Sequence, residues 1–496
     1  MIRPTRIFVI SDLHLGGDAP AMMSFPQVLA EFITSVPTRI RPDEAIELVI
    51  AGDVIDFLAI ELGGKVDAWT VDPQRAVAKL EKAIARDKPV YDALATHLAA
   101  GHGLTILIGN HDLELALPAV QAALCKHLKC RPGAIHFVDD GRAWRFGRAH
   151  VEHGNRYDDA NLNDWTSLRE IASSQSRGET PLSQLQPSFG SQLVRDVVAK
   201  HKPTFEFLDT LQPQGVLVAY LMATLDPSLI SSLPDLLKVW RGQRKEAGNP
   251  VGAAPKDKAH RGEPATRRDE PTAQHPVQLL AEVDLGSELD LAKLDAMFDK
   301  HPPPEPDGSK PVTRSGKPVT TRSGKPVTRS NEPLKVVREL LRPTDESLIN
   351  YFSRDERVPQ WRLRHVQTTL LEMTWGDNSL ESNGPVGTWG HAAERIRRHT
   401  DAQVVVMGHT HQAREVREKG LAIYINTGTW ADLVRIPTEV LAANEAGWAA
   451  LEAWLKNLYL DRKVRELRPT WAEIRVEPDG EVTSAELKRA DAIRAT

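Results

Sequence analysis

Five short blocks of carboxylate, imidazole and amide residues recur along the chain, and strand-like apolar runs precede most of them. In chain order the blocks are Asp12-Leu13-His14, Gly52-Asp53-Val54-Ile55-Asp56, Gly109-Asn110-His111-Asp112, His153-Gly154 and Gly408-His409-Thr410-His411. Side chains at the carboxyl ends of several strands converge on one crevice of an open α/β sheet. The order of the blocks therefore predicts an α/β fold whose strand ends bring nitrogen and oxygen ligands together for two divalent cations.

Strand and helix signals alternate in the first third of the chain. Short β-branched runs, typical of buried strands, occupy residues 7–10, 46–50 and 105–108. Residues 73–100 carry apolar side chains at helical spacing and are followed by glycines. Residues 135–138 and 142–152 are predicted to be strands of a second sheet. We therefore expect an α/β pattern with antiparallel additions, in the wider α+β sense.

The same pattern returns near the end of the chain. Predicted strands occupy residues 404–407 and 422–425, and a last hairpin joins residues 471–476 to 481–484. The first and last portions are expected to form one domain, with a large insertion between the blocks of His153 and His409. The predicted divisions are a core, first part (1–170), a helical insert (171–240), a mostly disordered linker (241–333), a second helical part (334–395) and a core, second part (396–496).

The insertion combines apolar helical stretches with polar, low-complexity sequence. Residues 216–225 and 229–240 would form either a lid over a bulky ligand or an ordinary helical subdomain. Residues 310–331 repeat the unit Lys-Pro-Val-Thr-Arg-Ser-Gly, which is too short to stack into a core. This basic repeat is expected to be a solvated tether, with binding of a polyanion as the alternative.

The composition is that of an ordinary soluble chain. Its 496 residues, 41% of them hydrophobic, allow two to four domains, and a net charge of -5 gives no general attraction to nucleic acid. Cys125 and Cys130 are expected to be reduced thiols, although their spacing also permits a disulfide. The longest apolar stretch, residues 215–225, is far shorter than the ~20 residues of a membrane span. We expect a cytoplasmic protein without a leader or transmembrane segment, which at most touches a membrane peripherally.

The residue types in the blocks suit a dinuclear site. Asp53 follows Gly52 at a strand end, so each of its carboxylate oxygens could face one ion. Asn110 supplies an amide oxygen, and Asp112 could hydrogen-bond an imidazole and hold its orientation. Without a thiolate, the set suits Mn²⁺, Fe, Zn²⁺, Co²⁺ or Ni²⁺.

Each block also has a purely structural explanation. Asp12 could be a turn residue, Asp53 a helix cap and Asn110 a left-handed turn residue. Such coincidences would have to occur five times in one order, so the joint pattern favours the metal site. His150 lies on the same predicted strand as His153, and we favour His153 because Gly154 and Asn155 end the strand there.

Taken together, the blocks resemble the motif set of the calcineurin-like metallophosphoesterase superfamily, over residues 1–170 and about 400–485. The resemblance implies a four-layer αββα sandwich that holds two metal ions, with manganese the first expectation. By this resemblance, the first metal would be bound by Asp12, His14, Asp53 and His411, and the second by Asp53, Asn110, His153 and His409. His111 would protonate or stabilise the leaving oxygen, Asp112 would orient His111, and Asp56 would structure its loop.

The resemblance also implies hydrolysis of a phosphodiester, favoured over a phosphomonoester, by a hydroxide that the metal ions activate. Arg156 or Arg414 could help to neutralise the phosphate of a nucleotide- or lipid-linked substrate. The blocks are distantly similar to those of bacterial UDP-2,3-diacylglucosamine hydrolases, which are shorter and carry arginine at the position of His111. The alternatives are a DNA or RNA nuclease of the same superfamily, which would need a basic face on the folded core, and a non-catalytic scaffold, which usually lacks some ligands.

Overall fold

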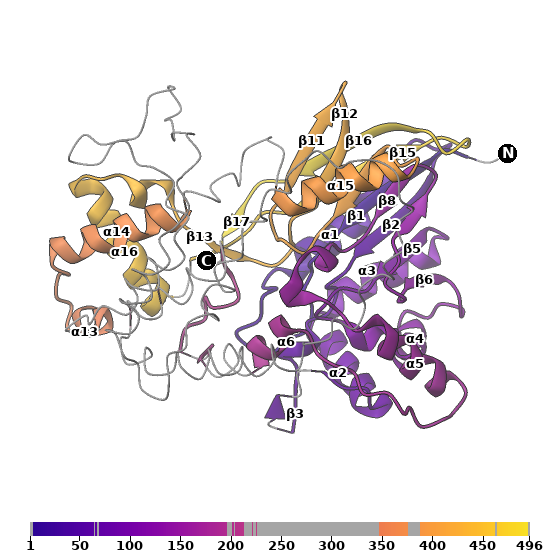
Figure 1. Cartoon of the computed structure of the whole chain (residues 1–496), viewed down its shortest axis with the longest axis horizontal. Coiled ribbons are helices and arrows are strands. Elements are labelled where there is room, and N and C mark those ends of the chain that lie inside the picture. The colour runs from indigo at the N-terminus through magenta and orange to yellow at the C-terminus, as the bar shows by residue number, and fades with distance from the viewer. Residues whose placement is uncertain are drawn as a thin grey trace, which may run out of the picture. The chain divides into compact units, whose positions relative to one another are not determined.

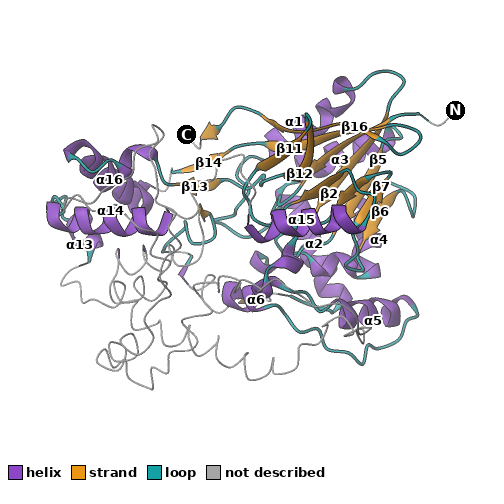
Figure 2. Ribbon diagram, turned by 45° about the horizontal axis from the view of Figure 1, so that its top comes forward, coloured by secondary structure: helices purple, strands orange, loops and turns teal. Residues whose placement is uncertain are grey.

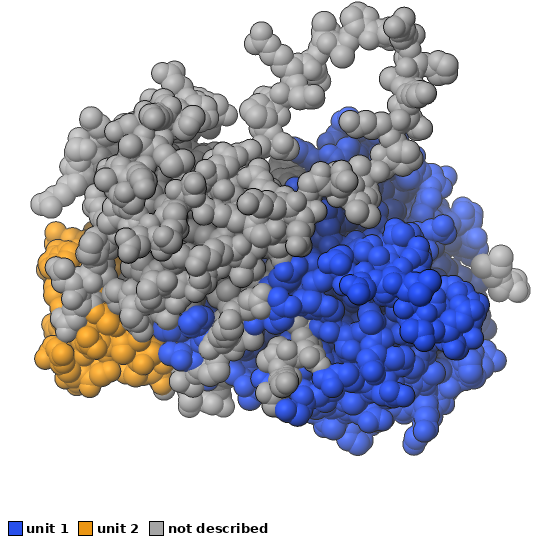
Figure 3. Space-filling model, turned by 60° about the horizontal axis from the view of Figure 1, so that its bottom comes forward, with its two compact units in different colours: residues 1–212, 379–435, 462–496 blue, residues 213–378, 436–461 orange. Residues whose placement is uncertain are grey.

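The computed structural model describes residues 3–63, 65–66, 69–195, 201–202, 204–212, 221, 225, 347–374, 387–461 and 464–494. The chain divides into two compact units, blue and orange in Figure 3: residues 1–212, 379–435 and 462–496 form unit 1, and residues 213–378 and 436–461 form unit 2. The predicted linker 241–333 with its basic repeat lies outside the described residues, as does most of the predicted helical stretch 216–240.

A six-stranded mixed sheet forms the centre of unit 1 (Figure 1). In spatial order its strands are β16 (Val482–Arg489), β15 (Thr470–Val476), β1 (Thr5–Ile10), β2 (Ala45–Ala51), β5 (Gly103–Leu107) and β6 (Ile135–Val138). Strands β1, β2, β5 and β6 run parallel, whereas β15 is antiparallel to β1 and β16 to β15. Phe8 of β1 therefore has Leu48 on one side and Glu473, from the end of the chain, on the other.

A second, five-stranded mixed sheet belongs to the same unit. In spatial order its strands are β11 (Arg414–Glu418), β12 (Leu421–Asn426), β10 (Val404–Met407), β8 (Ala149–Val151) and β7 (Trp144–Phe146). The three inner strands are parallel, and both edge strands are antiparallel to their neighbours. This sheet also joins early and late segments, because His150 of β8 is registered with Val405 of β10.

The alternation of side chains along β1 divides the core of unit 1 into layers. Ile7 and Val9 belong to an apolar cluster between the two sheets, together with Val151 and Val406 of the second sheet. Phe8 and Ile10 point the other way, into a larger cluster with the helices. The helices of that cluster are α1 (Pro26–Ser35), α2 (Pro73–Arg86), α3 (Lys88–Ala99), α4 (Pro118–His127) and α5 (Trp165–Ser176).

The outer face of the five-stranded sheet is covered by α15 (Gly387–His399). Ala392 and Ala393 of this helix pack with Val405 and Tyr424 of the sheet. Figure 2 shows α15 lying along the strands of this sheet. Unit 1 is thus a mixed α/β structure in which helices, the six-stranded sheet, the five-stranded sheet and α15 follow one another as layers.

One prediction about these elements was wrong, and a second was confirmed with one break in the helix. Residues 135–138 were expected in the second sheet, but β6 pairs in parallel with β5 at the edge of the six-stranded sheet. The helical stretch 73–100 is two helices, which meet at Asp87. The break has a local cause, because Pro89 lacks the amide hydrogen that a continuous helix would need. The Asp87 carboxylate accepts from the amide of Gly16 (2.6 Å), so the break also fixes the loop after β1.

The remaining elements are smaller. Strands β17 (Ile493–Arg494), β14 (Arg465–Leu467), β13 (Leu433–Arg435) and β9 (Leu211–Gln212) form a four-stranded sheet. Strands β3 (Glu61–Leu62) and β4 (Lys65–Val66) form a two-stranded sheet, and α6 (Phe189–Leu193) follows α5. In unit 2 the helices that can be described are α13 (Leu348–Ser353), α14 (Gln360–Thr374) and α16 (Glu445–Lys456).

Two further predictions can be compared with the structure. Cys125 and Cys130 are both free thiols, as predicted, and the Cys125 thiol donates to the carbonyl of Cys130 (3.3 Å). Among the described residues, no helix has the length and apolar character needed to cross a membrane.

Candidate metal centre

The loops after β1 and β2 run side by side and carry three of the predicted ligands. The amide of Asp12 donates to the carbonyl of Gly52 (3.0 Å), and the amide of His14 donates to the carbonyl of Asp53 (3.0 Å). These bonds continue the parallel pairing of β1 with β2 beyond the strand ends. The backbone alone therefore holds Asp12, His14 and Asp53 close together.

Five predicted ligand residues adopt left-handed backbone angles, although none of them is glycine. The φ angles are +53° at Asp12, +47° at His14, +50° at Asp53, +70° at His409 and +56° at His411. Other residue types enter this region at a cost of roughly 1–2 kcal/mol each. Only three other described non-glycine residues do so. Backbone strain persists where surrounding structure enforces it, typically at functional sites, so its concentration here is evidence independent of the sequence motifs.

The glycines of three blocks allow ligand side chains to approach the backbone closely. A Cβ atom at Gly52 would collide with the ring of His153, and one at Gly109 would collide with the carboxylate of Asp53. A Cβ atom at Gly408 would collide with the carboxylate of Asp12. Each glycine is therefore required by sterics, because the space beside it is filled by a predicted ligand.

Asp12, His14 and His411 form a first, buried group of potential ligands. His411 Nε2 lies 3.1 Å from His14 Nε2 and 3.3 Å from Asp12 Oδ1. The Asp12 carboxylate also accepts the amide of His409 at 3.0 Å, which connects the loop after β1 to the loop after β10. The group therefore combines residues that are about four hundred positions apart in the chain.

Asp53, His153 and His409 form a second group, with Asn110 beside them. His153 Nε2 lies 3.2 Å from Asp53 Oδ2 and 3.3 Å from Asn110 Oδ1. His153 Nδ1 donates to the carbonyl of Ala51 (2.8 Å), so Nε2 is the ring nitrogen that faces the group. Asp53 Oδ2 is also 4.0 Å from His14 Nε2, so this carboxylate faces both groups.

The spacing of these atoms fits metal binding. Donor atoms that each lie 2.0–2.2 Å from one cation are about 3–3.5 Å from one another. The contacts of His411 Nε2 and His153 Nε2 with their neighbours, 3.1–3.3 Å, fall in that range. His14 Nε2 and His411 Nε2 face each other, and the contact between them has room for one hydrogen at most. Imidazole nitrogens with carboxylate and amide oxygens, and no sulfur, suit the divalent transition metals named above.

The electrostatics of the groups keep the carboxylates charged. Burial alone would raise the pKa of Asp12, but the hydrogen bond with His411 and the nearby imidazoles hold it below its ordinary value. Burial would likewise raise the pKa of Asp53, which His153 and His111 hold well below its ordinary value. Burial and the neighbouring imidazoles lower the pKa of His14 to about 3, so its ring is neutral, as a metal ligand must be.

His111 lies beside the two groups and is oriented by Asp56, not by Asp112. His111 Nδ1 is 3.1 Å from Asp56 Oδ1, and its ring meets that of His14 edge to face, with centroids 4.8 Å apart. His14, Asp56 and His111 are close enough to form a third potential ligand group. The prediction that Asp112 orients His111 was wrong, because the Asp112 carboxylate accepts backbone amides of its own loop and of Val54.

The environment of His111 favours its protonated form. Burial alone would lower the pKa of His111, but the charge of Asp53 and the bond to Asp56 raise it to about 9. Burial would raise the pKa of Asp56, which His111 lowers to about 2. Burial and the charge of Asp53 raise the pKa of Asp112 to about 7, which agrees with a structural role for that side chain.

The other candidates lie outside these groups. His150 is on β8, with Nε2 3.8 Å from Glu152 and no contact to a ligand group recorded. Arg156 reaches the carbonyl of Gly141, and Arg414 begins β11. The choice of His153 over His150 therefore agrees with the geometry.

Sequence reasoning missed Asp158, whose Oδ2 lies 3.0 Å from His409 Nε2. Burial would raise the pKa of Asp158, but His409 and Asn161 hold it at about 2. The signal in the sequence is that Asp158 follows the predicted ligand His153 closely, in a segment rich in Asn and Asp between positions 155 and 164.

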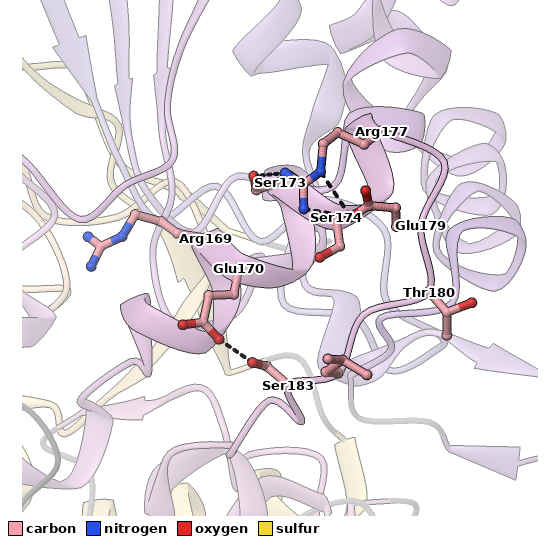
Figure 4. A pocket seen from close by; sticks show the side chains of 9 residues that line it. Arg169, Glu170, Ser173, Ser174, Arg177, Glu179, Thr180 and Ser183 are labelled. Carbon is pink, nitrogen blue, oxygen red and sulfur yellow. Dashed lines mark hydrogen bonds and ion pairs between the residues drawn. The ribbon is translucent and has the colours of Figure 1, made fainter.

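An open pocket of about 520 Å³ lies elsewhere on unit 1, on α5 and the loop that follows it (Figure 4). Arg177 donates to Glu179 (2.7 Å) and Ser173 (2.6 Å), and Ser183 donates to Glu170. Arg169 donates to the carbonyl of Asp140 outside the pocket (2.9 Å), so these charged groups have hydrogen-bond partners, and no predicted metal ligand lines the pocket.

Comparisons of the chain with models of protein families, with curated proteins and with solved structures found no match. The case for a function therefore depends on the residues and geometry of the centre itself.

Proposed function

We propose that the protein is a dinuclear-metal-dependent phosphoesterase of the calcineurin-like metallophosphoesterase superfamily. The observation that carries the proposal is the position of Asp53. Its Oδ2 lies 3.2 Å from His153 Nε2 and 4.0 Å from His14 Nε2, so one carboxylate faces both ligand groups. The order of layers in unit 1, with two mixed sheets between helices, supports the four-layer sandwich that the resemblance implies.

The residues divide the work of such a reaction. Two cations held by these groups would activate a water molecule and neutralise charge on the phosphate oxygens. Asp53 would set the spacing of the two groups. His111, whose backbone amide contacts Asp53 and whose ring lies beside His14, would donate a proton to the leaving oxygen. Asp56 would hold the His111 ring by its Nδ1 side, leaving Nε2–H for that donation.

The test uses the full chain, Mn²⁺ and two chromogenic substrates. We expect metal-dependent hydrolysis of bis-p-nitrophenyl phosphate, exceeding that of p-nitrophenyl phosphate, and two bound metal ions per chain by elemental analysis. Asp53→Asn should lose most of this turnover, because an amide provides one ligand oxygen where the carboxylate provides two.

Asp43→Asn is the matched control, since it makes the same substitution at an exposed position. Wild-type turnover by Asp53→Asn, or two bound ions without hydrolysis of either ester, would contradict the phosphoesterase proposal. Cleavage of single- or double-stranded DNA in preference to both small esters would assign the site to a nuclease.

A further inference from the structure

The loop of residues 155–163 contacts two predicted ligands of the second group, Asn110 and His409, which belong to other loops. It includes two short 3-10 turns, Asn155–Tyr157 and Asp159–Asn161, directly after His153 and Gly154. Its polar side chains point back toward the loops after β5 and β10. The contacts that result connect Asn110 with His409 through the 155–163 loop.

Asp158 contacts the ring of His409. His409 Nε2 lies 3.0 Å from Asp158 Oδ2. A carboxylate only accepts, so Nε2 carries the hydrogen and the lone pair of His409 is on Nδ1. The same carboxylate is fixed in place, because it accepts from Asn161 Nδ2 (2.7 Å) and from the amide of Ala160 (3.0 Å).

Asn161 and Asn163 hold the loop of Asn110. Asn110 Nδ2 donates to Asn161 Oδ1 (3.4 Å), which turns the Asn110 carbonyl oxygen toward His153. Asn163 Nδ2 donates to the carbonyl of Gly109 (2.8 Å). An Asn side chain exposes either its oxygen or its nitrogen, so its partner decides which of them can bind a metal ion.

From these contacts we propose that Asp158 and Asn161 are positioning residues that select the ligand atoms His409 Nδ1 and Asn110 Oδ1 and thereby set the affinity of the second metal ion. The proposal rests on the proposed dinuclear centre. Hydrogen-bonding partners of metal ligands typically change metal affinity by 10–100-fold when they are removed. The structure records no contact between the 155–163 loop and Asp12, His14 or His411. The affinity of the first group for its metal ion should therefore not depend on the loop.

Helix α6, near the start of the predicted insertion, lies directly against this loop. Gly190 of α6 lies so close to Asn161 that a Cβ atom would collide with Asn161 Oδ1. Gly190→Ala would therefore displace Asn161 without removing any group of the 155–163 loop. This variant tests the positioning role from outside the loop itself.

The experiment measures stepwise Mn²⁺ binding to the full chain by calorimetry and the magnetic coupling of the bound ions by electron paramagnetic resonance. Asp158→Ala should weaken the second ion about 10–100-fold. Asp158→Asn, Asn161→Ala and Gly190→Ala should weaken the second ion to a smaller extent, and the first ion should bind as in the wild type. Loss of the second ion should also replace the coupled-pair spectrum by that of an isolated Mn²⁺. Asp159→Ala, which removes an exposed carboxylate next to Asp158, is the matched control.

Wild-type affinity of both ions in Asp158→Ala, or equal weakening of both, would overturn the positioning role. Selective loss of the second ion in a chain that hydrolyses no phosphoester would support the positioning role and reject the proposed function. Fewer than two ions bound by the wild type would overturn both.

Discussion

His111 contacts two carboxylates in different ways, one through its backbone and one through its ring. Asp53 accepts the backbone amide of His111 at 2.9 Å, which fixes the main chain, and Asp56 contacts ring Nδ1 at 3.1 Å, which fixes the ring. Both charges raise the pKa of His111, whereas the ring of His14 beside it stays neutral. Two histidines with centroids 4.8 Å apart thus have pKa values shifted in opposite directions.

Replacement of His111 should separate proton donation from metal binding. If His111 donates a proton to the leaving group, His111→Asn should lower kcat by about 10²–10⁴-fold while the protein still binds two Mn²⁺ ions. The measurement is steady-state hydrolysis of bis-p-nitrophenyl phosphate, with metal content determined on the same samples. His136→Asn, at an exposed position of β6, is the control. A drop in bound metal would instead identify His111 as a ligand, as the third group allows.

His97 should make the fold sensitive to acid. Its Nε2 donates to the carbonyl of Gly103 (2.9 Å), and its Nδ1 is buried without a partner among the described residues. Burial lowers the pKa of His97 to about 4, below the 6.5 of an exposed histidine. Between those values the unfolded chain binds more protons, so the free energy of unfolding should fall as pH drops from about 6.5 toward 4, by at most about 3 kcal/mol.

Urea unfolding at pH 7.5 and pH 5 measures this loss. His97→Gln, which can still donate to Gly103, should reduce the difference between the two pH values. His127→Gln, at an exposed position of α4, should leave the difference unchanged. Equal pH dependence in wild type and His97→Gln would show that His97 does not titrate in this way.

At the scale of elements, the sequence predicted the strands at the centre of the fold and not the details at its edges. The runs that became β1, β2, β5 and β10 are short, β-branched and buried on both faces, which makes them recognisable from composition alone. The sheet to which β6 belongs depends on tertiary pairing, which a four-residue strand does not encode.

The same distinction applies to the centre. The candidate ligands are recognisable in the sequence because residues of metal-binding type directly follow strand-like runs. The contact of Asp56 with His111 is not recognisable in the sequence, because Asp112 is adjacent to His111 whereas Asp56 is 55 positions away. Asp158 was missed for a similar reason, since its contact with His409 spans 251 positions.

Gly109 gives a prediction about the turn after β5. In Gly109→Ala, the new methyl group would meet the carboxylate of Asp53, so Asp53 must move away from both ligand groups. We expect Mn²⁺ affinity to fall by 10-fold or more, in the range seen when ligand geometry is disturbed. Calorimetric titration of Mn²⁺ measures this change.

Gly133→Ala is the control for overall stability. Gly133 has a φ of +79° and no atom near its potential Cβ, so the substitution should cost about 1 kcal/mol in folding and nothing in metal affinity. If both variants bound Mn²⁺ equally well, the steric explanation for Gly109 would be wrong.

At the scale of the whole molecule, unit 1 is assembled from three separate stretches of chain. Strand pairs β1–β15 and β8–β10 join these stretches, and the candidate ligands come from both sides of the insertion. The core should therefore not depend on covalent continuity through the insertion.

A cleavable chain tests this independence. We introduce a specific protease site within the repeat at residues 317–324 and cleave the purified protein. The two fragments should co-elute in gel filtration and keep the Mn²⁺-dependent turnover proposed for the uncut chain, because β1 and β15 share a registered pairing of five residues. Cleavage of the same site in a urea-unfolded sample provides the separated fragments as a reference. Elution of the cut native protein as two separate species would contradict the expectation.

The pairing of β1 with β15 has a consequence for the timing of synthesis. One edge of β1 has no pairing partner until residues about 465 positions later have been synthesised, which at 5–20 residues per second takes roughly 20–90 s of translation. During this interval a buried strand of the nascent chain has one unpaired edge, and His409 and His411 have not left the ribosome for most of it. The candidate ligand groups therefore cannot be complete until the segment with His409 and His411 has been synthesised, long after Asp12, His14 and Asp53.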